Sequence, residues 1–215
     1  AALIADEPVT LQNFPTKLLD VKHKASFIEA IGGSVKIDHA KEEVNIDSAS
    51  ISNVELNDYI VPIRTTYLLA AGLLKKNGIA RIPYPEGCKI GERKYDLHIM
   101  VWENFGAVVE EKKDFIEIRL KDQLKPAEIH FPINTIGGTE NALICAATID
   151  GETTIKNAYI SPEIEDLITF LKSLGVDINT DGNSFIKVIG RNYLRGTNHQ
   201  VMPDRIEALT WLIYG

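Results

Sequence analysis

The stretch Ala142-Leu143-Ile144-Cys145-Ala146-Ala147-Thr148-Ile149 is apolar on all sides. A second stretch, Tyr67-Leu68-Leu69-Ala70-Ala71-Gly72-Leu73-Leu74, has the same character. A helix without a polar face belongs in the interior of a domain, because every side of it must be covered by other apolar groups. These two segments therefore predict buried helices around which the rest of the chain packs.

Each buried helix is expected to be followed by a short strand and then by an amphipathic helix. The predicted strands are Val9–Gln12, Ile79–Ile82 and Thr153–Lys156, and the predicted amphipathic helices are Ser26–Ala30, Leu97–Asn104 and Glu163–Leu171. A glycine stands just past each amphipathic helix, at Gly32, Gly106 and Gly175. Glycine suits the left-handed conformation that commonly ends a helix.

After each of these glycines the apolar pattern changes from helical to alternating, which predicts a strand hairpin. The hairpins are Ser34–Asp38 with Glu43–Asp47, Val108–Glu111 with Phe115–Leu120, and Asp177–Asn179 with Phe185–Ile189. The unit is therefore helix, strand, helix, strand, strand, and it recurs three times at a spacing of about 70 residues. The pattern predicts an α/β (α+β) fold with buried helices and outer sheets; an unrelated α/β sandwich is the alternative.

Bulk composition narrows the classes of function. The 215 residues are 45% hydrophobic and carry a formal net charge of −7. With no basic stripe to neutralise phosphates, nucleic acid is not expected as the main partner, although an anionic small substrate is compatible with a few converging cations. The sequence contains no apolar run long enough to cross a membrane. The chain begins and ends inside apolar patterns, so we expect that it is cut at both ends.

The two cysteines have different surroundings. Cys145 lies in the apolar run and is predicted to be a buried core thiol. Cys88 lies in Pro83-Tyr84-Pro85-Glu86-Gly87-Cys88-Lys89-Ile90-Gly91-Glu92-Arg93, where two prolines and two glycines indicate an exposed loop. Lys89 and Arg93 favour the thiolate, so this cysteine is a candidate nucleophile or proton donor. The alternative is a surface-loop cysteine with incidental basic neighbours.

Four motifs in this order resemble the enolpyruvyl transferases that start peptidoglycan synthesis: 87–93, 136–141, Pro162-Glu163-Ile164 and Pro203-Asp204-Arg205-Ile206-Glu207. The resemblance covers nearly the whole chain, from Asp6 to Glu207. It implies one lobe of an inside-out α/β barrel over residues 1–202, with repeats at about 1–50, 61–121 and 135–190. Residues 203–215 would then begin the crossing into a second lobe; a capping cluster at a helix start is the alternative for Asp204–Glu207.

The resemblance also implies an activity and its site. The family transfers the enolpyruvyl group of phosphoenolpyruvate to UDP-N-acetylglucosamine, in the cytoplasm and without a cofactor or metal. Its reactive cysteine, the target of fosfomycin, falls on Cys88, and its phosphoenolpyruvate-binding arginines fall on Arg64 and Arg93. The positions implied for the UDP-sugar are Arg93, Lys94, Tyr95, Asp96, Leu97, Thr135, Ile136 and Gly137. Because the second lobe is absent, this chain alone is not expected to turn over.

Three departures from the family pattern leave the acceptor open. The usual Pro-Gly-Gly-Cys is here Pro85-Glu86-Gly87-Cys88, and the usual Arg-Pro-Val-Asp is Arg93-Lys94-Tyr95-Asp96. The usual Ser-Val-Gly-Ala is here the segment 135–138. A diverged paralogue with another nucleotide-linked acceptor is one alternative, and a non-catalytic nucleotide-sugar binding module is another. The related shikimate-pathway enzyme lacks such a cysteine loop, so Cys88 argues against it.

Overall fold

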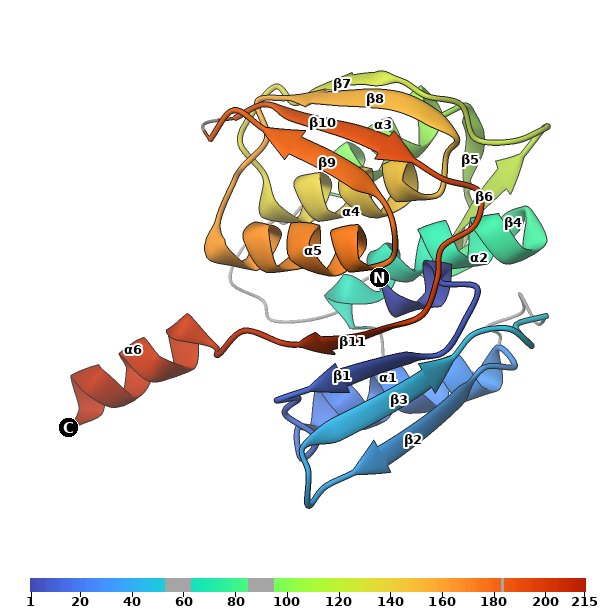
Figure 1. Ribbon diagram of the computed structural model, residues 1–215. Coiled ribbons are helices and arrows are strands. Elements are labelled where there is room, and N and C mark those ends of the chain that lie inside the picture. Colours follow the sequence, from blue (N-terminus) through green and yellow to red (C-terminus); the bar gives the residue numbers. More distant parts are fainter. Residues whose placement is uncertain (53–62, 85–94, 183) are drawn as a thin grey trace.

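The chain folds into three β-sheets that surround buried helices (Figure 1). The computed structural model describes residues 1–52, 63–84, 95–182 and 184–215. The first unit contains η1 (Ala2–Ile4), β1 (Val9–Gln12), α1 (Leu19–Ala30), β2 (Ser34–Asp38) and β3 (Glu43–Asp47). The second contains η2 (Arg64–Leu69), α2 (Ala70–Asn77), β4 (Ile79–Pro83), α3 (Asp96–Asn104), β5 (Ala107–Glu111) and β6 (Phe115–Leu120). The third contains α4 (Ile136–Ala147), β8 (Gly151–Lys156), α5 (Pro162–Ser173), β9 (Asp177–Thr180) and β10 (Ile186–Gly190).

The predicted fold class is confirmed, and the three units share one strand topology. In each unit the hairpin strands pair antiparallel, and the last hairpin strand also pairs antiparallel with the strand that precedes the amphipathic helix. The strand orders are β1-β3-β2, β4-β6-β5 and β8-β10-β9. Alternating burial along β10 and β4 directs one face of each sheet to the helices, as a period of two requires.

Two strands fall outside the predicted repeats. The strand β7 (Glu128–His130) pairs parallel with β8, and β11 (Thr197–Gln200) pairs parallel with β1. The β1–β11 register places Val9 opposite Thr197, so the first sheet is completed by a segment from near the end of the chain. Neither strand was expected, because Glu128–His130 and Thr197–Gln200 are short and mostly polar and so show no apolar period.

The two helices predicted to be apolar on all sides are buried, but their ends differ from the prediction. Helix α4 ends at Ala147, and Thr148 serves as its C-cap. The other predicted helix is divided into the 3₁₀ helix η2 and the α-helix α2. The Thr66 hydroxyl donates to the carbonyl of Ile63, and such side-chain bonds compete with regular helical geometry. Burial of α2 and α4 nevertheless follows the sequence pattern.

The glycines predicted to end the amphipathic helices do so. Gly32, Gly106 and Gly175 have φ values of 99°, 91° and 105°, which place all three in the left-handed region. An L side chain is disfavoured there, so glycine lets the chain reverse into the hairpin at low cost. Gly190 has another role, because a Cβ atom there would lie 2.0 Å from the carbonyl oxygen of Ala146. The β10 backbone therefore touches the C-terminal end of α4.

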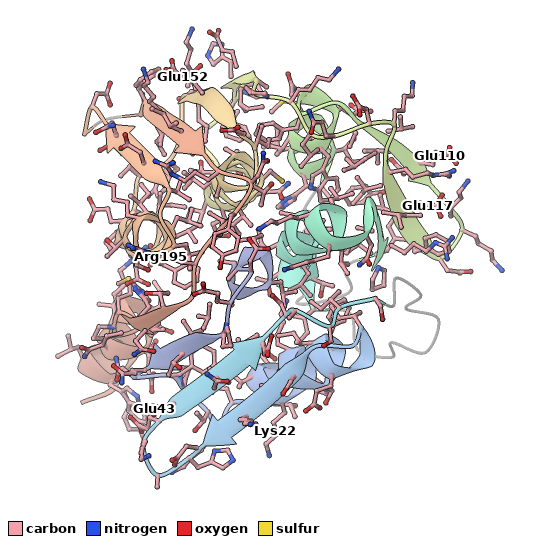
Figure 2. All side chains as sticks on the ribbon, turned by 45° about the vertical axis from the view of Figure 1, so that its right-hand side comes forward. Lys22, Glu43, Glu110, Glu117, Glu152 and Arg195 are labelled. Atoms are coloured by element: carbon pink, nitrogen blue, oxygen red, sulfur yellow. The ribbon has the colours of Figure 1, made fainter. Side chains whose placement is uncertain are left out.

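The outer faces of the sheets carry cross-strand ion pairs. Lys187 Nζ lies 2.6 Å from Glu152 Oε2 between β10 and β8, and Arg81 Nε lies 2.8 Å from Glu117 Oε2 between β4 and β6. Figure 2 shows Glu152 at the periphery of its sheet. Opposite charges on neighbouring strands support one register; the Lys187–Glu152 pair lies on an exposed face, whereas Glu117 is 6% exposed. The layers therefore run from charged sheets outside to apolar helices inside.

The last helix, α6 (Arg205–Tyr214), extends away from the rest of the chain (Figure 1). All its side chains are exposed, including Trp211 at 63% and Leu212 at 78%. These large apolar side chains form an exposed apolar surface along one helix. Among the described residues, no helix is long and apolar enough to cross a bilayer.

Candidate functional site

Two helix N-termini meet at the positions implied for the UDP-sugar. Helix α3 begins at Asp96, with Tyr95 as its N-cap, and α4 begins at Ile136 with Thr135 as its N-cap. A Cβ atom on Gly137 would lie 3.3 Å from His98 Nε2, so the first turn of α4 touches α3 closely. The structure therefore brings together the described residues of two motifs about 40 residues apart in sequence.

The first turn of α4 has the geometry of an anion site. The Thr135 hydroxyl accepts from the backbone N–H of Gly138 at 3.1 Å. The N–H groups of Ile136 and Gly137 have no acceptor within the helix, because the first turn of any helix leaves them free. Ile136 is 40% exposed, so this turn is open to solvent. Together with the helix dipole, these N–H groups can hold phosphate oxygens.

Gly138, the second of the two consecutive glycines in this turn, has no space around it for a side chain. A Cβ atom on Gly138 would lie 2.5 Å from Thr135 Cγ2 and 2.9 Å from Phe131 Cε1. These distances are far shorter than van der Waals contact, so a side chain would push the capping threonine away. The family's usual alanine is thus replaced by glycine where this chain leaves no space for a methyl group.

Tyr95 is part of a row of aromatic rings at the start of α3. Its ring centroid lies 5.8 Å from that of Tyr84 and 6.0 Å from that of Tyr67. The Tyr95 hydroxyl donates to Glu111 Oε2 at 3.1 Å, and the Tyr84 hydroxyl donates to the carbonyl of Lys112 at 2.7 Å. Because burial and the nearby Glu111 carboxylate both disfavour the phenolate, the pKa of Tyr95 is raised. Both tyrosines therefore stay protonated and anchored to the β5–β6 hairpin.

Four predicted site residues receive no side-chain description. Cys88, Arg93 and Lys94 lie outside the described residues. Arg64 is the first residue of η2, and its side chain is likewise outside the described part. The backbone of η2 is nevertheless placed by Tyr67, whose ring lies 4.8 Å from His98 and 6.0 Å from Tyr95. The start of η2 thus belongs to the same region as α3.

A buried polar contact holds α3 against α4, and sequence reasoning missed it. The Trp102 indole Nε1 donates to Asn141 Oδ1 at 3.2 Å, and Asn141 Nδ2 donates to the carbonyl of His98 at 3.4 Å. Trp102 and Asn141 are fully buried. The signal was present, since Asn141 stands at the border of the apolar run, and a buried amide requires partners. Asn141 therefore orients the two helix starts.

One ion pair joins the start of α6 to the start of α5. Arg205 Nε donates to Glu163 Oε1 at 2.6 Å, and the hydrogen bond from Arg205 lowers the pKa of Glu163 to about 2. The Asp204 carboxylate accepts from the N–H groups of Ile206 and Glu207 at 2.8 and 3.2 Å. Asp204 is therefore an N-cap, as the helix-start interpretation predicted, while the crossing into a second lobe at these residues stays a prediction.

Three further observations concern Cys145, His98 and the capacity to bind a metal ion. The prediction of a core thiol at Cys145 is confirmed, because the residue is fully buried and burial raises the pKa of its thiol to about 12. His98 is 8% exposed and packs against the rings of Tyr67 and Trp102, which also contact each other. Within the described ranges, no group of three or more His, Cys, Asp or Glu side chains could hold a metal ion.

Comparison with known proteins identifies a family that this chain matches and several relatives that it resembles. Residues 1–215 match the family described as EPSP synthase (3-phosphoshikimate 1-carboxyvinyltransferase). The UDP-N-acetylglucosamine 1-carboxyvinyltransferase of Wolbachia sp. subsp. Drosophila simulans (strain wRi) is 36% identical over 219 residues, and the UDP-N-acetylglucosamine 1-carboxyvinyltransferase 1 of Carboxydothermus hydrogenoformans is 38% identical over 219 residues. Each alignment covers 99% of this chain but only 51% and 50% of the relative. The chain spans about half the length of the curated relatives it matches.

Solved structures agree with the fold. The enolpyruvyl transferase NikO from Streptomyces tendae superimposes with a TM-score of 0.86 at 25% identity, over 100% of this chain and 50% of that one. An EPSP synthase from Acinetobacter baumannii gives a TM-score of 0.72 at 19% identity, over 99% of this chain and 48% of that one. The second likeness shows the fold alone.

Proposed function

We propose, on the premise that this chain belongs to the EPSP synthase (3-phosphoshikimate 1-carboxyvinyltransferase) family, that it is one lobe of an enolpyruvyl transferase. The whole protein transfers the enolpyruvyl group of phosphoenolpyruvate to the 3′-hydroxyl of UDP-N-acetylglucosamine and releases phosphate. This reaction is the first committed step of peptidoglycan synthesis, so the protein acts in the cytoplasm and supports cell shape and division.

One observation carries the proposal. Relatives named UDP-N-acetylglucosamine 1-carboxyvinyltransferase are 36% to 38% identical across 99% of this chain. The residues to which we assign phosphoenolpyruvate binding and acid catalysis, Arg64, Cys88 and Arg93, lie within that span. Arginine suits the carboxylate and phosphate of phosphoenolpyruvate, because its planar fork binds such oxyanions through two hydrogen bonds.

Each described part of the site has a task in this reaction. The first turn of α4, at Thr135, Ile136 and Gly137, binds the diphosphate of the sugar nucleotide through backbone N–H groups. The start of α3, at Tyr95, Asp96 and Leu97, borders the uridine together with Arg93 and Lys94. Cys88 acts as general acid at the vinyl carbon of phosphoenolpyruvate.

The site is half of a complete one. The apolar side chains of α6 and the coverage of about half of each relative support a second lobe that supplies the remaining groups. Catalysis then takes place in a cleft between lobes that excludes water. The 215-residue chain alone is expected to bind substrate weakly and to show no turnover.

A second acceptor is favoured by one specific feature. Tyr95 stands where the family usually has valine, and its ring packs between Tyr84 and Tyr67. A different side chain next to the expected position of the uracil base favours a paralogue that uses another nucleotide-linked acceptor. Measuring kcat/KM for a panel of nucleotide sugars and free nucleotides distinguishes the two, because a hydrogen-bonding site rejects an acceptor that leaves its polar groups unpaired.

The test of the main proposal is the mass of the intact, full-length protein after exposure to fosfomycin, with Cys88→Ala as control. A single adduct that is absent in the variant and forms faster with UDP-N-acetylglucosamine is the expected result. An adduct without acceleration would keep the cysteine chemistry and reject this acceptor. No adduct would refute the reactive thiol, and a nucleotide-sugar binding module without catalysis would take its place.

A further inference from the structure

A small apolar cavity that opens to solvent lies between α1 and the inner face of the β3–β2 hairpin, with Thr65 of η2 at its edge. Its volume is 190 Å³, and its apolar lining includes Phe14, Ile28, Val35 and Val44. An engineered cavity of about 150 Å³ with similar apolar lining takes up benzene. The space therefore matches a compact apolar molecule of about that size.

Two charged side chains, Asp20 and Lys24, also line this cavity. They stand one helical turn apart on α1, and residues four apart lie on the same helix face. The cavity thus combines apolar walls with one amine and one carboxyl group. This combination has no part in the enolpyruvyl transfer proposed above.

The surroundings change the protonation of the amine. Burial against the apolar lining lowers the pKa of Lys24 to about 8, and the charge of Asp20 opposes this effect only in part. An ordinary lysine has a pKa of about 10.4, so the unprotonated amine of Lys24 is on the order of 200 times more abundant at neutral pH. A lysine desolvated in an apolar pocket is a recognised nucleophile toward carbonyl compounds.

We propose that Lys24 is a modification site that forms an imine with small, neutral, apolar aldehydes or ketones entering this cavity. The lone pair of Lys24 Nζ forms a bond to the carbonyl carbon, and the carbonyl oxygen leaves as water. The nitrogen loses two protons in all: the first converts the carbonyl oxygen into a hydroxyl, and the second, carried through water by the Asp20 carboxylate, lets that hydroxyl leave as water while the C=N bond forms. A neutral carbonyl compound is favoured over an apolar carboxylate, because the Asp20 charge repels an anion.

The experiment exposes the full-length protein to benzaldehyde and sodium cyanoborohydride at pH 7, and peptide mass mapping then locates the reduced adducts. Lys22 is the internal control, because it lies on the same helix, is exposed and points into solvent (Figure 2). We expect the adduct at Lys24 to form at least about tenfold faster than at Lys22, with a rate that rises toward pH 8.

Three variants complete the test. Lys24→Arg should lose the fast adduct, Lys22→Arg should keep it, and Asp20→Asn, compared at pH 9 where Lys24 is largely unprotonated in both proteins, should slow it severalfold. Labelling of Lys24 and Lys22 at equal rates in the unaltered protein would overturn the proposal, and this comparison does not depend on whether any variant folds. Fast labelling that survives Lys24→Arg would overturn it as well. Enolpyruvyl transferase activity enters none of these measurements, so failure of the proposed function leaves the test intact.

Discussion

The contact between Asn141 and Trp102 allows a quantitative prediction about how the two helix starts are held. Replacing Asn141 with alanine removes the acceptor of the Trp102 indole N–H, 3.2 Å away, in a place where neither residue is exposed. A buried donor without a partner costs about 1–3 kcal/mol, and the lost bond to the His98 carbonyl adds about 1 kcal/mol. The free energy of unfolding should therefore fall by about 2–4 kcal/mol.

A double-mutant cycle isolates the pair. Trp102→Phe removes the same donor while keeping an aromatic ring, so the double variant should lose about 1–2 kcal/mol less than the sum of the single variants. The free energy of unfolding of all four proteins is measured by guanidinium denaturation. Unfolding is followed by far-UV circular dichroism, so the signal does not depend on the fluorescence of Trp102. Asn179→Ala, at an exposed position of strand β9, is the matched control and should change stability by less than about 0.5 kcal/mol.

The outcome that refutes this reasoning is additivity. If the coupling between Asn141 and Trp102 is below about 0.5 kcal/mol, the hydrogen bond does not hold α3 against α4. A second consequence concerns binding, since the same contact orients Gly137 beside His98. Asn141→Ala should therefore weaken binding of the nucleotide acceptor to the full-length protein, as isothermal calorimetry can measure, whereas Asn179→Ala should not.

Three further predictions follow from other contacts. Gly190→Ala should destabilise by about 3 kcal/mol or more in thermal unfolding, because the new Cβ would meet the Ala146 carbonyl oxygen at 2.0 Å; a loss under about 1 kcal/mol would contradict the packing of β10 on α4. Burial raises the pKa of Asp6, but its interactions with neighbouring groups, above all the hydrogen bond from Lys75 at 2.5 Å, together outweigh burial, so the pKa is lowered in the folded protein. The stability that this carboxylate contributes is therefore complete above its ordinary pKa of about 3.9. It is lost as the pH falls through the lower pKa of the folded state. Asp6→Asn should therefore be less stable at neutral pH and should show a flatter loss below about pH 4, and an unchanged acid-unfolding curve would refute this. Burial raises the pKa of Cys145 to about 12, so iodoacetamide at pH 8 should leave this thiol unmodified in the native protein and modify it after unfolding, as mass mapping can check.

Local patterns were sufficient for the repeated unit. The apolar run after Asn141, the glycines that end the amphipathic helices and the alternating hairpins each express a periodicity within a few residues. Strand β1, for example, was predicted at Val9–Gln12 and is found there. The helix boundaries were less predictable, as α1 begins at Leu19 rather than Ser26, because amphipathicity is weak along its first turns.

The candidate site shows the same division. The motifs at 136–141 and 95–97 were predicted from a resemblance, and their proximity came only from the packing of α3 on α4. Glu111, which anchors the Tyr95 hydroxyl, was not predicted, because an exposed glutamate on a strand carries no local signal of its partner. Cys88, Arg93 and Lys94 lie outside the described residues, and their roles remain predictions.

The sequence by itself determined the order of the helices and strands of the repeated unit, apart from β7, β11 and the 3₁₀ helix η2, and it determined which helices must be buried. These features depend on periodicity and on residues close together in the chain. Only the tertiary structure decided which distant segments meet. The parallel pairing of β11 with β1 joins residues about 190 positions apart, and the contact of Trp102 with Asn141 joins two helices. Such contacts are selected by the shape of the whole core, because many short segments could pair equally well until packing leaves space for one.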